Sequence, residues 1–234
     1  MSELLADAAR RASRYIDTLD SRRVAPAPEA LAALSRFERA LPEQSSTAES
    51  VLAELDELGS PATMASTGGR FFGFVTGAAL PVTVAASWLA TTWDQNAAMV
   101  VNAPLNAQLE IVASRWLIEL FGLPPQSACG FVTCATTANF SALAAARHAL
   151  LARAGWDVEA QGLFGAPPLT VVVGGEVHSS MQKALAMIGF GRERVVTVPV
   201  DSQGRMLASA LPTLDDRTIV CVQAGNVNTG CFDP

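Results

Sequence analysis

Apolar residues near the start of the chain recur at helical spacing, in short segments divided by prolines and by a Gly-Ser-Pro turn. The spacing predicts helices over residues 2–19, 29–40 and 51–58, each with an apolar stripe along one side. Helices of this length cannot cover their stripes by packing on one another alone. We therefore expect residues 1–80 to form a helical arm that packs on a larger body or acts as a dimerisation segment.

Residues 71–93 contain no charged side chain, over a length sufficient to cross a bilayer. Glycines, threonines and Pro81 dilute the hydropathy of this segment, which favours a buried core or interface over a membrane span. The pattern predicts a buried helix over residues 81–100. A second helix is expected over 105–121, because Pro104 is well tolerated in a first helical turn.

From residue 130 onward, short β-branched runs alternate with helical patterns. Strands are expected at 130–134, 169–174, 195–198 and 218–222, with helices at 137–154, 179–188 and 207–214 between them. This alternation is typical of a mostly parallel, doubly wound α/β sheet. We therefore expect residues 81–234 to form one α/β domain, with the sheet still incomplete at the last residue.

Composition narrows the class of protein. Half of the residues are hydrophobic and only 16% are charged, as expected where parallel strands are apolar on both faces. A net charge of −6 argues against nucleic-acid binding, because no basic stripe is present to neutralise phosphates.

The four cysteines and two histidines lack metal-ligand spacing, so we expect no metal site. With free thiols and no apolar signal peptide, we expect a cytoplasmic protein.

A turn of small and hydroxyl residues, Ala135 with Thr136 and Thr137, lies between a predicted strand and a predicted helix. Backbone N–H groups at a helix N-terminus bind phosphate, and hydroxyl side chains add further donors. The same residue types also suit plain N-capping, so this turn alone leaves both interpretations open.

Two more polar loops follow predicted strands. His178 stands where open α/β sheets place their ligands, and an imidazole there can stack on a flat ring, act as acid or base, or simply cap a helix. The last loop, residues 223–234, contributes Asn226 and Asn228, although asparagines are common in ordinary turns. Three polar loops after strands of one sheet predict a ligand crevice. Since no dinucleotide fingerprint or Walker A lysine is present, we expect a phosphorylated ligand other than a dinucleotide or ATP.

These motifs resemble those of the group II pyridoxal-phosphate-dependent amino-acid decarboxylases, the family of the aromatic-L-amino-acid and glutamate decarboxylases. The resemblance rests on the arm, RFFGFVTG at 70–77, the TCATTAN turn, HSS at 178–180 and GNVNTGCFDP at 225–234. It implies the large domain of fold type I, the aspartate aminotransferase fold, with pyridoxal 5'-phosphate as cofactor. It also implies decarboxylation of an amino-acid substrate, in a homodimer whose active site lies at the interface.

The resemblance also implies roles for individual residues. The ring of His178 stacks on the cofactor, and Ala135 and Thr136 bind its phosphate. Phe74 and Thr76 belong to the segment that shapes the substrate pocket across the dimer interface.

Several positions depart from the family pattern. Gly68-Gly69-Arg70 replaces a His-Pro pair, and Cys134-Ala135 stands where two glycines are common. A threonine of the last loop contacts the cofactor in the aromatic branch, whereas an ungapped match puts Val227 there. Asn226 or Asn228 is the substitute, and we assign Asn228.

The family's Schiff-base lysine and the aspartate that pairs with the pyridine nitrogen are expected beyond Pro234. Lys183, the single lysine, lies in a predicted helix just after His178 and is interpreted as a surface residue. Because cofactor chemistry needs both groups, we expect the chain as given to be inactive. Two alternatives remain: a phospholyase or aminotransferase reaction on the same fold, or a non-catalytic dimerising remnant.

Overall fold

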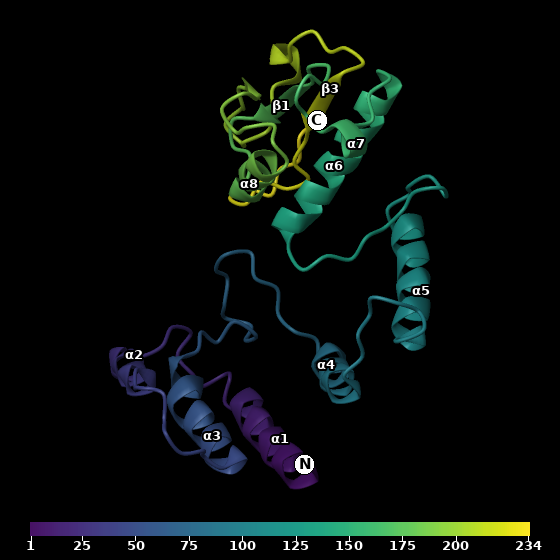
Figure 1. The fold of residues 1–234 in the computed structure, drawn as a ribbon. Coiled ribbons are helices and arrows are strands. Elements are labelled where there is room, and N and C mark those ends of the chain that lie inside the picture. The colour runs from purple at the N-terminus through teal and green to yellow at the C-terminus, as the bar shows by residue number, and fades with distance from the viewer. The chain divides into compact units, whose positions relative to one another are not determined.

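The computed structural model describes all 234 residues. Its first unit, Met1–Gln95, is helical. Its helices are α1 (Ser2–Asp17), α2 (Pro28–Ala33), α3 (Ala48–Glu54) and α4 (Pro81–Trp93) (Figure 1). The predicted helix over 29–40 is shorter than expected, because the α-helix passes at Leu34–Phe37 into a 3-10 turn. A wider π-type turn, Leu55–Gly59, continues α3.

Ion pairs hold α1 against the turn that follows α3. Arg11 Nη1 lies 2.9 Å from Asp56 Oδ2, and Arg14 donates to the same carboxylate oxygen. Further along α1, the hydroxyls of Tyr15 and Thr63 lie 3.0 Å apart. The predicted arm therefore has internal polar contacts that fix the direction of its first helix.

Helix α4 was expected to be buried, and this expectation is wrong for the chain by itself. Every α4 residue except Val84 is exposed, including Trp88 and Trp93. An apolar sequence indicates that a helix needs a covering surface, but it does not say which element supplies that surface.

The second part, Asn96–Pro234, contains a three-stranded sheet made of β1 (Thr170–Gly174), β2 (Val196–Val198) and β3 (Thr218–Cys221). Its helices are α5 (Pro104–Leu120), α6 (Ala135–Arg153), α7 (Val158–Gln161) and α8 (Ser179–Met187). The strand order is β2-β1-β3 and both pairings are parallel, which confirms the predicted parallel sheet. The short helix α7 was not predicted.

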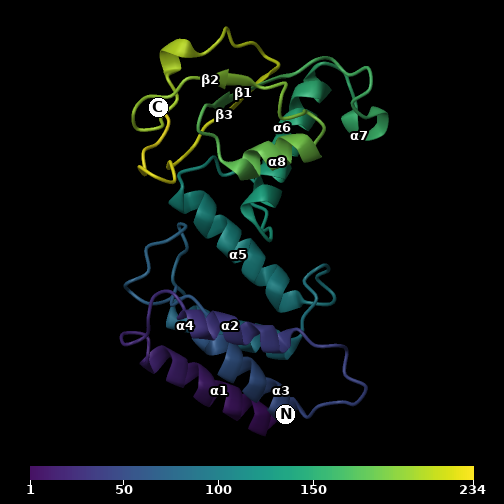
Figure 2. The same ribbon diagram turned by 90° about the vertical axis from the view of Figure 1, so that its left-hand side faces the viewer.

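Alternation along β1 divides the core of this unit between the two faces of the sheet. Val171 and Val173 pack with Leu143 of α6 and Leu185 of α8, and Figure 2 shows these two helices beside the sheet. On the opposite face, Val172 packs with Val198 and with Met206 from the segment after β2. Because both faces of β1 are buried, its sequence is a continuous apolar run.

One predicted strand is absent, and one predicted helix is much shorter than expected. Residues 130–134 form no strand, because the segment has no neighbouring strand with which to make a ladder. The helix expected at 207–214 is reduced to a 3-10 turn, Ala208–Ala210. Pro212 explains this difference, since proline disfavours helical backbone at the residue before it and supplies no N–H.

The two units are Met1–Gln95 and Asn96–Pro234. The functional division into an arm, residues 1–80, and a cofactor domain, residues 81–234, stays a prediction. No helix combines the length and the apolar character needed to cross a bilayer.

Candidate active site

The carboxyl ends of β1 and β3 open into a cavity of about 200 Å³ within the unit Asn96–Pro234. Its polar lining comes from the loops after these strands and from α6, namely Asn139, Glu176, His178, Gln223 and Asp233. Apolar atoms of Val177, Met181 and Cys221 complete the walls. Parallel sheets bind their ligands at this edge, where the loops that follow the strands meet.

His178 lies between the end of β1 and the start of α8, as the N-cap residue of that helix. Its ring nitrogen Nδ1 accepts the backbone N–H of Ser180 at 3.1 Å and lies 2.8 Å from the Ser180 hydroxyl oxygen. These two contacts turn the Nδ1 edge of the ring toward the helix. The short HSS motif therefore fixes the position of the imidazole locally.

Asn139 links α6 to this motif. Its amide nitrogen donates to the Ser180 hydroxyl oxygen at 2.9 Å, and Ser180 is buried, with 7% of its surface exposed. Since Asn139 and His178 both line the cavity, the hydrogen bond holds two of its walls together.

The N-terminus of α6 presents a cluster of donors. The N–H groups of Ala135, Thr136 and Thr137 precede the first intrahelical bond, in which the N–H of Ala138 donates to the carbonyl oxygen of Cys134. The Thr137 hydroxyl lowers the pKa of the Cys134 thiol, and the N–H groups of Thr137 and Thr136 lower this pKa further. A negative charge is therefore favoured at this end of α6.

The last loop is organised around Asn226, which is 4% exposed. The Asn226 amide nitrogen donates to Glu176 Oε2 at 2.7 Å. Its side-chain oxygen accepts the N–H of Asn228 at 2.9 Å and that of Thr229 at 3.3 Å. Because both ends of its amide are engaged, Asn226 has a structural role: it shapes its own loop and holds the Glu176 carboxylate at the cavity.

Asp233 joins two segments beside the cavity. One carboxylate oxygen accepts the N–H of Met206 and the other accepts the N–H of Gln223, both at 2.7 Å. The backbone N–H of Asp233 returns to the carbonyl of Gln223 at 3.0 Å. The Phe-Asp-Pro end of the last loop is thereby tied to the end of β3.

The predicted site residues lie at different distances from the cavity along the chain, and not all of them line it. His178 lines it, while Ala135 and Thr136 lie one helical turn before Asn139 on α6. Asn228 is exposed and its side chain is not part of the cavity wall. Of the residues predicted for the three loops, His178 alone lines the cavity, and Asn226 contacts the lining residue Glu176 from the third loop.

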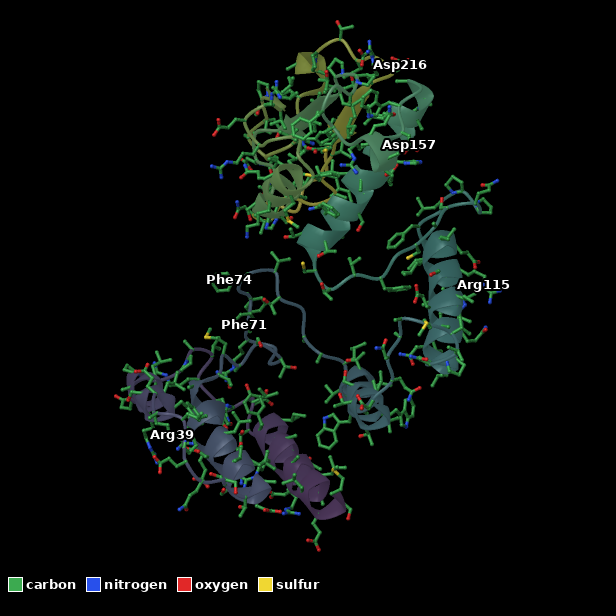
Figure 3. All side chains as sticks on the ribbon, viewed as in Figure 1. Arg39, Phe71, Phe74, Arg115, Asp157 and Asp216 are labelled. Carbon is green, nitrogen blue, oxygen red and sulfur yellow. The ribbon has the colours of Figure 1, made fainter.

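Phe74 and Thr76 belong to the other unit, in the segment between α3 and α4. Figure 3 labels Phe71 and Phe74 on this segment, and 93% of the Phe74 surface is exposed. The backbone φ angles of Phe74 and Val75 are 58° and 55°, in the left-handed region that side chains rarely adopt. The segment therefore presents an aromatic ring to its surroundings from an uncommon backbone conformation.

Four polar residues of the cavity were missed from the sequence: Asn139, Glu176, Gln223 and Asp233. Asn139 carried a usable signal, because it follows Thr136 by three residues and so lies on the same helical face. The signal for Glu176 was its position two residues before His178, in the same segment between β1 and α8. Gln223 and Asp233 meet only because the last loop folds back on β3, and no local pattern indicated this.

An α/β unit with a polar crevice at the carboxyl ends of parallel strands defines a class of ligand-binding enzyme folds. A family model described as the pyridoxal-dependent decarboxylase conserved domain matches residues 28–234. The chain belongs to the pyridoxal-dependent decarboxylase family.

Individual relatives agree with this assignment. The aromatic-L-amino-acid decarboxylase of Bacillus atrophaeus is 28% identical over 172 residues, which cover 70% of this chain and 34% of the relative. Acidic amino acid decarboxylase GADL1 of Homo sapiens is 33% identical over 86 residues, which cover 33% of this chain and 16% of the relative. The matched segments thus cover 34% and 16% of the length of these two curated proteins.

Solved structures have the same fold. The crystal structure of mouse CSAD in apo form superposes with a TM-score of 0.84 at 22% identity, covering 100% of this chain and 50% of that one. Oryza sativa TDC with PLP and tryptamine gives 0.82 at 20% identity, covering 100% and 50%. The fold is that of the fold type I enzymes, and the chain spans half of each neighbour.

Proposed function

We propose that the chain is part of a pyridoxal-phosphate-dependent carboxy-lyase that decarboxylates an amino acid. The observation that carries the proposal is the meeting of His178, at the end of β1, with the donor-rich start of α6 through Asn139 and Ser180. When bound, pyridoxal phosphate supplies an electron sink for the electron pair left behind by the departing carboxyl group.

The start of α6 fits the phosphate of this cofactor. The donors that lower the pKa of the Cys134 thiol would equally stabilise a phosphate dianion. We assign this contact to the N–H groups of Ala135 and Thr136 and to the Thr136 hydroxyl.

His178 fits the ring of the cofactor, because its Nδ1 edge is held by α8 while the residue lines the cavity. A fixed imidazole plane can stack on a flat heteroaromatic ring without losing further side-chain freedom. Asn228 is proposed as an additional contact. This assignment requires the exposed part of the last loop to close on the ligand.

The substrate pocket and the dimer remain proposals of the same kind. Exposed apolar residues of α4, among them Val82, Trp88 and Leu89, support a large interface, and we propose a second copy of the chain as the partner. Phe74 and Thr76 would then contribute to the amino-acid pocket from across that interface. Sedimentation of the chain should give a dimer that Trp88→Glu weakens, whereas an unchanged monomer would contradict the proposed partner.

The phosphate assignment can be tested through Cys134. Iodoacetamide should alkylate Cys134 faster than Cys221, because burial raises the pKa of the Cys221 thiol. Pyridoxal phosphate should protect Cys134 from alkylation, since its phosphate would take the Thr136 N–H, one of the donors that lower the pKa of the thiol. Mass spectrometry of tryptic peptides measures both rates.

Replacement of Thr136 by Val should weaken this protection by about 1–3 kcal/mol in apparent affinity, the cost of a charge-assisted hydrogen bond. Thr170→Val is the matched control, because Thr170 is exposed at the opposite end of β1. Equal protection of Cys134 in both variants would place the phosphate elsewhere.

A further inference from the structure

The hydrogen bonds around Ser180 determine which nitrogen of His178 carries the proton. The backbone N–H of Ser180 can only donate, and it points at His178 Nδ1 with a nitrogen–nitrogen distance of 3.1 Å. Nδ1 must therefore offer a lone pair, which leaves the proton of the neutral ring on Nε2.

The same constraint orders the rest of the network. Because Nδ1 carries no proton, the Ser180 hydroxyl, 2.8 Å away, has to donate to it. The hydroxyl oxygen is then an acceptor, and the Asn139 amide nitrogen at 2.9 Å supplies its donor. The direction of every hydrogen bond from Asn139 to His178 follows from one backbone N–H group.

We propose that Asn139 and Ser180 are positioning residues that hold His178 as the Nε2–H tautomer, so that the ring offers the cavity a hydrogen-bond donor. Nδ1 is engaged with the backbone N–H and the hydroxyl of Ser180 at the start of α8. In its neutral form His178 thus stacks and donates through Nε2, and it does not act as a base through Nδ1. This inference deepens the proposed function, and a ligand with an acceptor oxygen opposite Nε2 is the one favoured.

The second histidine of the chain provides an internal comparison. His148 Nδ1 lies 2.7 Å from Glu159 Oε2, and both side chains are 57% exposed. A carboxylate can only accept, so Nδ1 of His148 must carry a proton. The two histidines are therefore expected to differ in the protonation of Nδ1.

Long-range proton–nitrogen NMR of the ¹⁵N-labelled chain distinguishes these states, because a protonated and an unprotonated ring nitrogen resonate far apart. The spectrum is recorded at about pH 9, where an imidazole is ordinarily neutral. His148→Gln leaves His178 as the single histidine and assigns its signals. His178 should show an unprotonated Nδ1 and a protonated Nε2, whereas a protonated Nδ1 would overturn the proposal.

Ser180→Ala removes the hydroxyl but keeps the backbone N–H. It should shift the tautomer ratio of His178 toward Nδ1–H by about two- to tenfold, the equivalent of one hydrogen bond. Asn139→Leu should produce a smaller shift in the same direction. Ser179→Ala is the matched control, since Ser179 is exposed and belongs to the same helical turn. An equal ratio in Ser179→Ala and Ser180→Ala would remove Ser180 from the positioning role.

Titration of pyridoxal phosphate into the same samples separates this inference from the proposed function. Absence of cofactor binding together with an Nε2–H tautomer would reject the proposed function and keep the positioning roles. Cofactor binding together with an Nδ1–H tautomer would reject the positioning roles and keep the proposed function.

Discussion

The Asn226 amide nitrogen donates to Glu176 Oε2 at 2.7 Å, and this bond joins the loop after β3 to the loop after β1. Asn226 is buried, and its side-chain oxygen also accepts two backbone N–H groups of its own loop. One amide thereby fixes the shape of the last loop and the position of a cavity carboxylate.

Replacement of Asn226 by Ala should lower the free energy of unfolding by about 1–3 kcal/mol, because buried donors and acceptors lose their partners. Asn228→Ala should change it by less than about 0.5 kcal/mol, as is usual for an exposed side chain. Urea unfolding measures both values. Equal effects of the two substitutions would contradict the structural role assigned to Asn226.

The hydrogen bond between Asn226 and Glu176 leaves no room for a side chain at Gly204. A Cβ atom there would lie 2.3 Å from Asn226 Nδ2 and 2.6 Å from Glu176 Oε2, and its φ is +74°. We expect Gly204→Ala to cost more than Gly230→Ala, because Gly230 has nearly the same φ, +72°, but open space around it. The control should cost about 1–2 kcal/mol, the penalty of left-handed backbone for alanine.

The clash at Gly204 can be isolated further in a double variant. Gly204→Ala combined with Asn226→Ala should be less destabilising than the sum of the two single changes, since the second change removes the obstructing amide. Additive unfolding free energies would place the cost of Gly204→Ala in the backbone alone.

The first unit should lose stability in acid. Arg39 donates to both carboxylate oxygens of Glu54, at 2.8 and 2.7 Å, and its hydrogen bonds hold the pKa of Glu54 below the ordinary 4.5. A lowered folded-state pKa stabilises the fold above the unfolded pKa, and this stabilisation disappears as the pH falls through the folded value. Glu54→Gln should therefore flatten the decline of the melting temperature below about pH 4.5.

Glu43→Gln is the matched control for this change, because Glu43 is exposed and forms no ion pair. Its melting curve should keep the acid dependence of the original chain. Identical acid profiles for all three proteins would show that the Arg39–Glu54 pair does not couple folding to protonation.

Lys183 should have no part in cofactor chemistry. It is exposed on α8, whereas His178 and Met181 of the same region line the cavity. Lys183→Gln should leave protection of Cys134 by pyridoxal phosphate unchanged. Stoichiometric, borohydride-stable labelling of Lys183, with binding lost in the variant, is the result that would reverse this assignment.

Periodicity and composition were sufficient to predict most of the second unit. The continuous apolar run that became β1 is buried on both faces, as expected for a central strand of a parallel sheet, whereas β3 at the sheet edge is only partly buried. The long helix α6 and the helix α8 after His178 followed from equally local signals. The family resemblance extended this to the fold type, which the solved structures confirm.

Other features depended on partners distant in sequence. Residues 130–134 have strand-like composition, yet a strand exists only where a neighbour completes its ladder. Helix α4 is apolar, but its exposure depends on which surface comes to cover it.

The sequence by itself determined the class of fold and pointed to His178, which lines the cavity at the carboxyl ends of the strands, while the ligand of that cavity stays a prediction. Only the tertiary structure decided that Asn139 donates to Ser180, that Asn226 donates to Glu176, and that Asn228 lies outside the cavity wall. The physical reason is that helices and strands follow from spacing along the chain. A hydrogen bond between loops instead depends on side-chain positions that the packing of α6, α8 and β3 has to fix first.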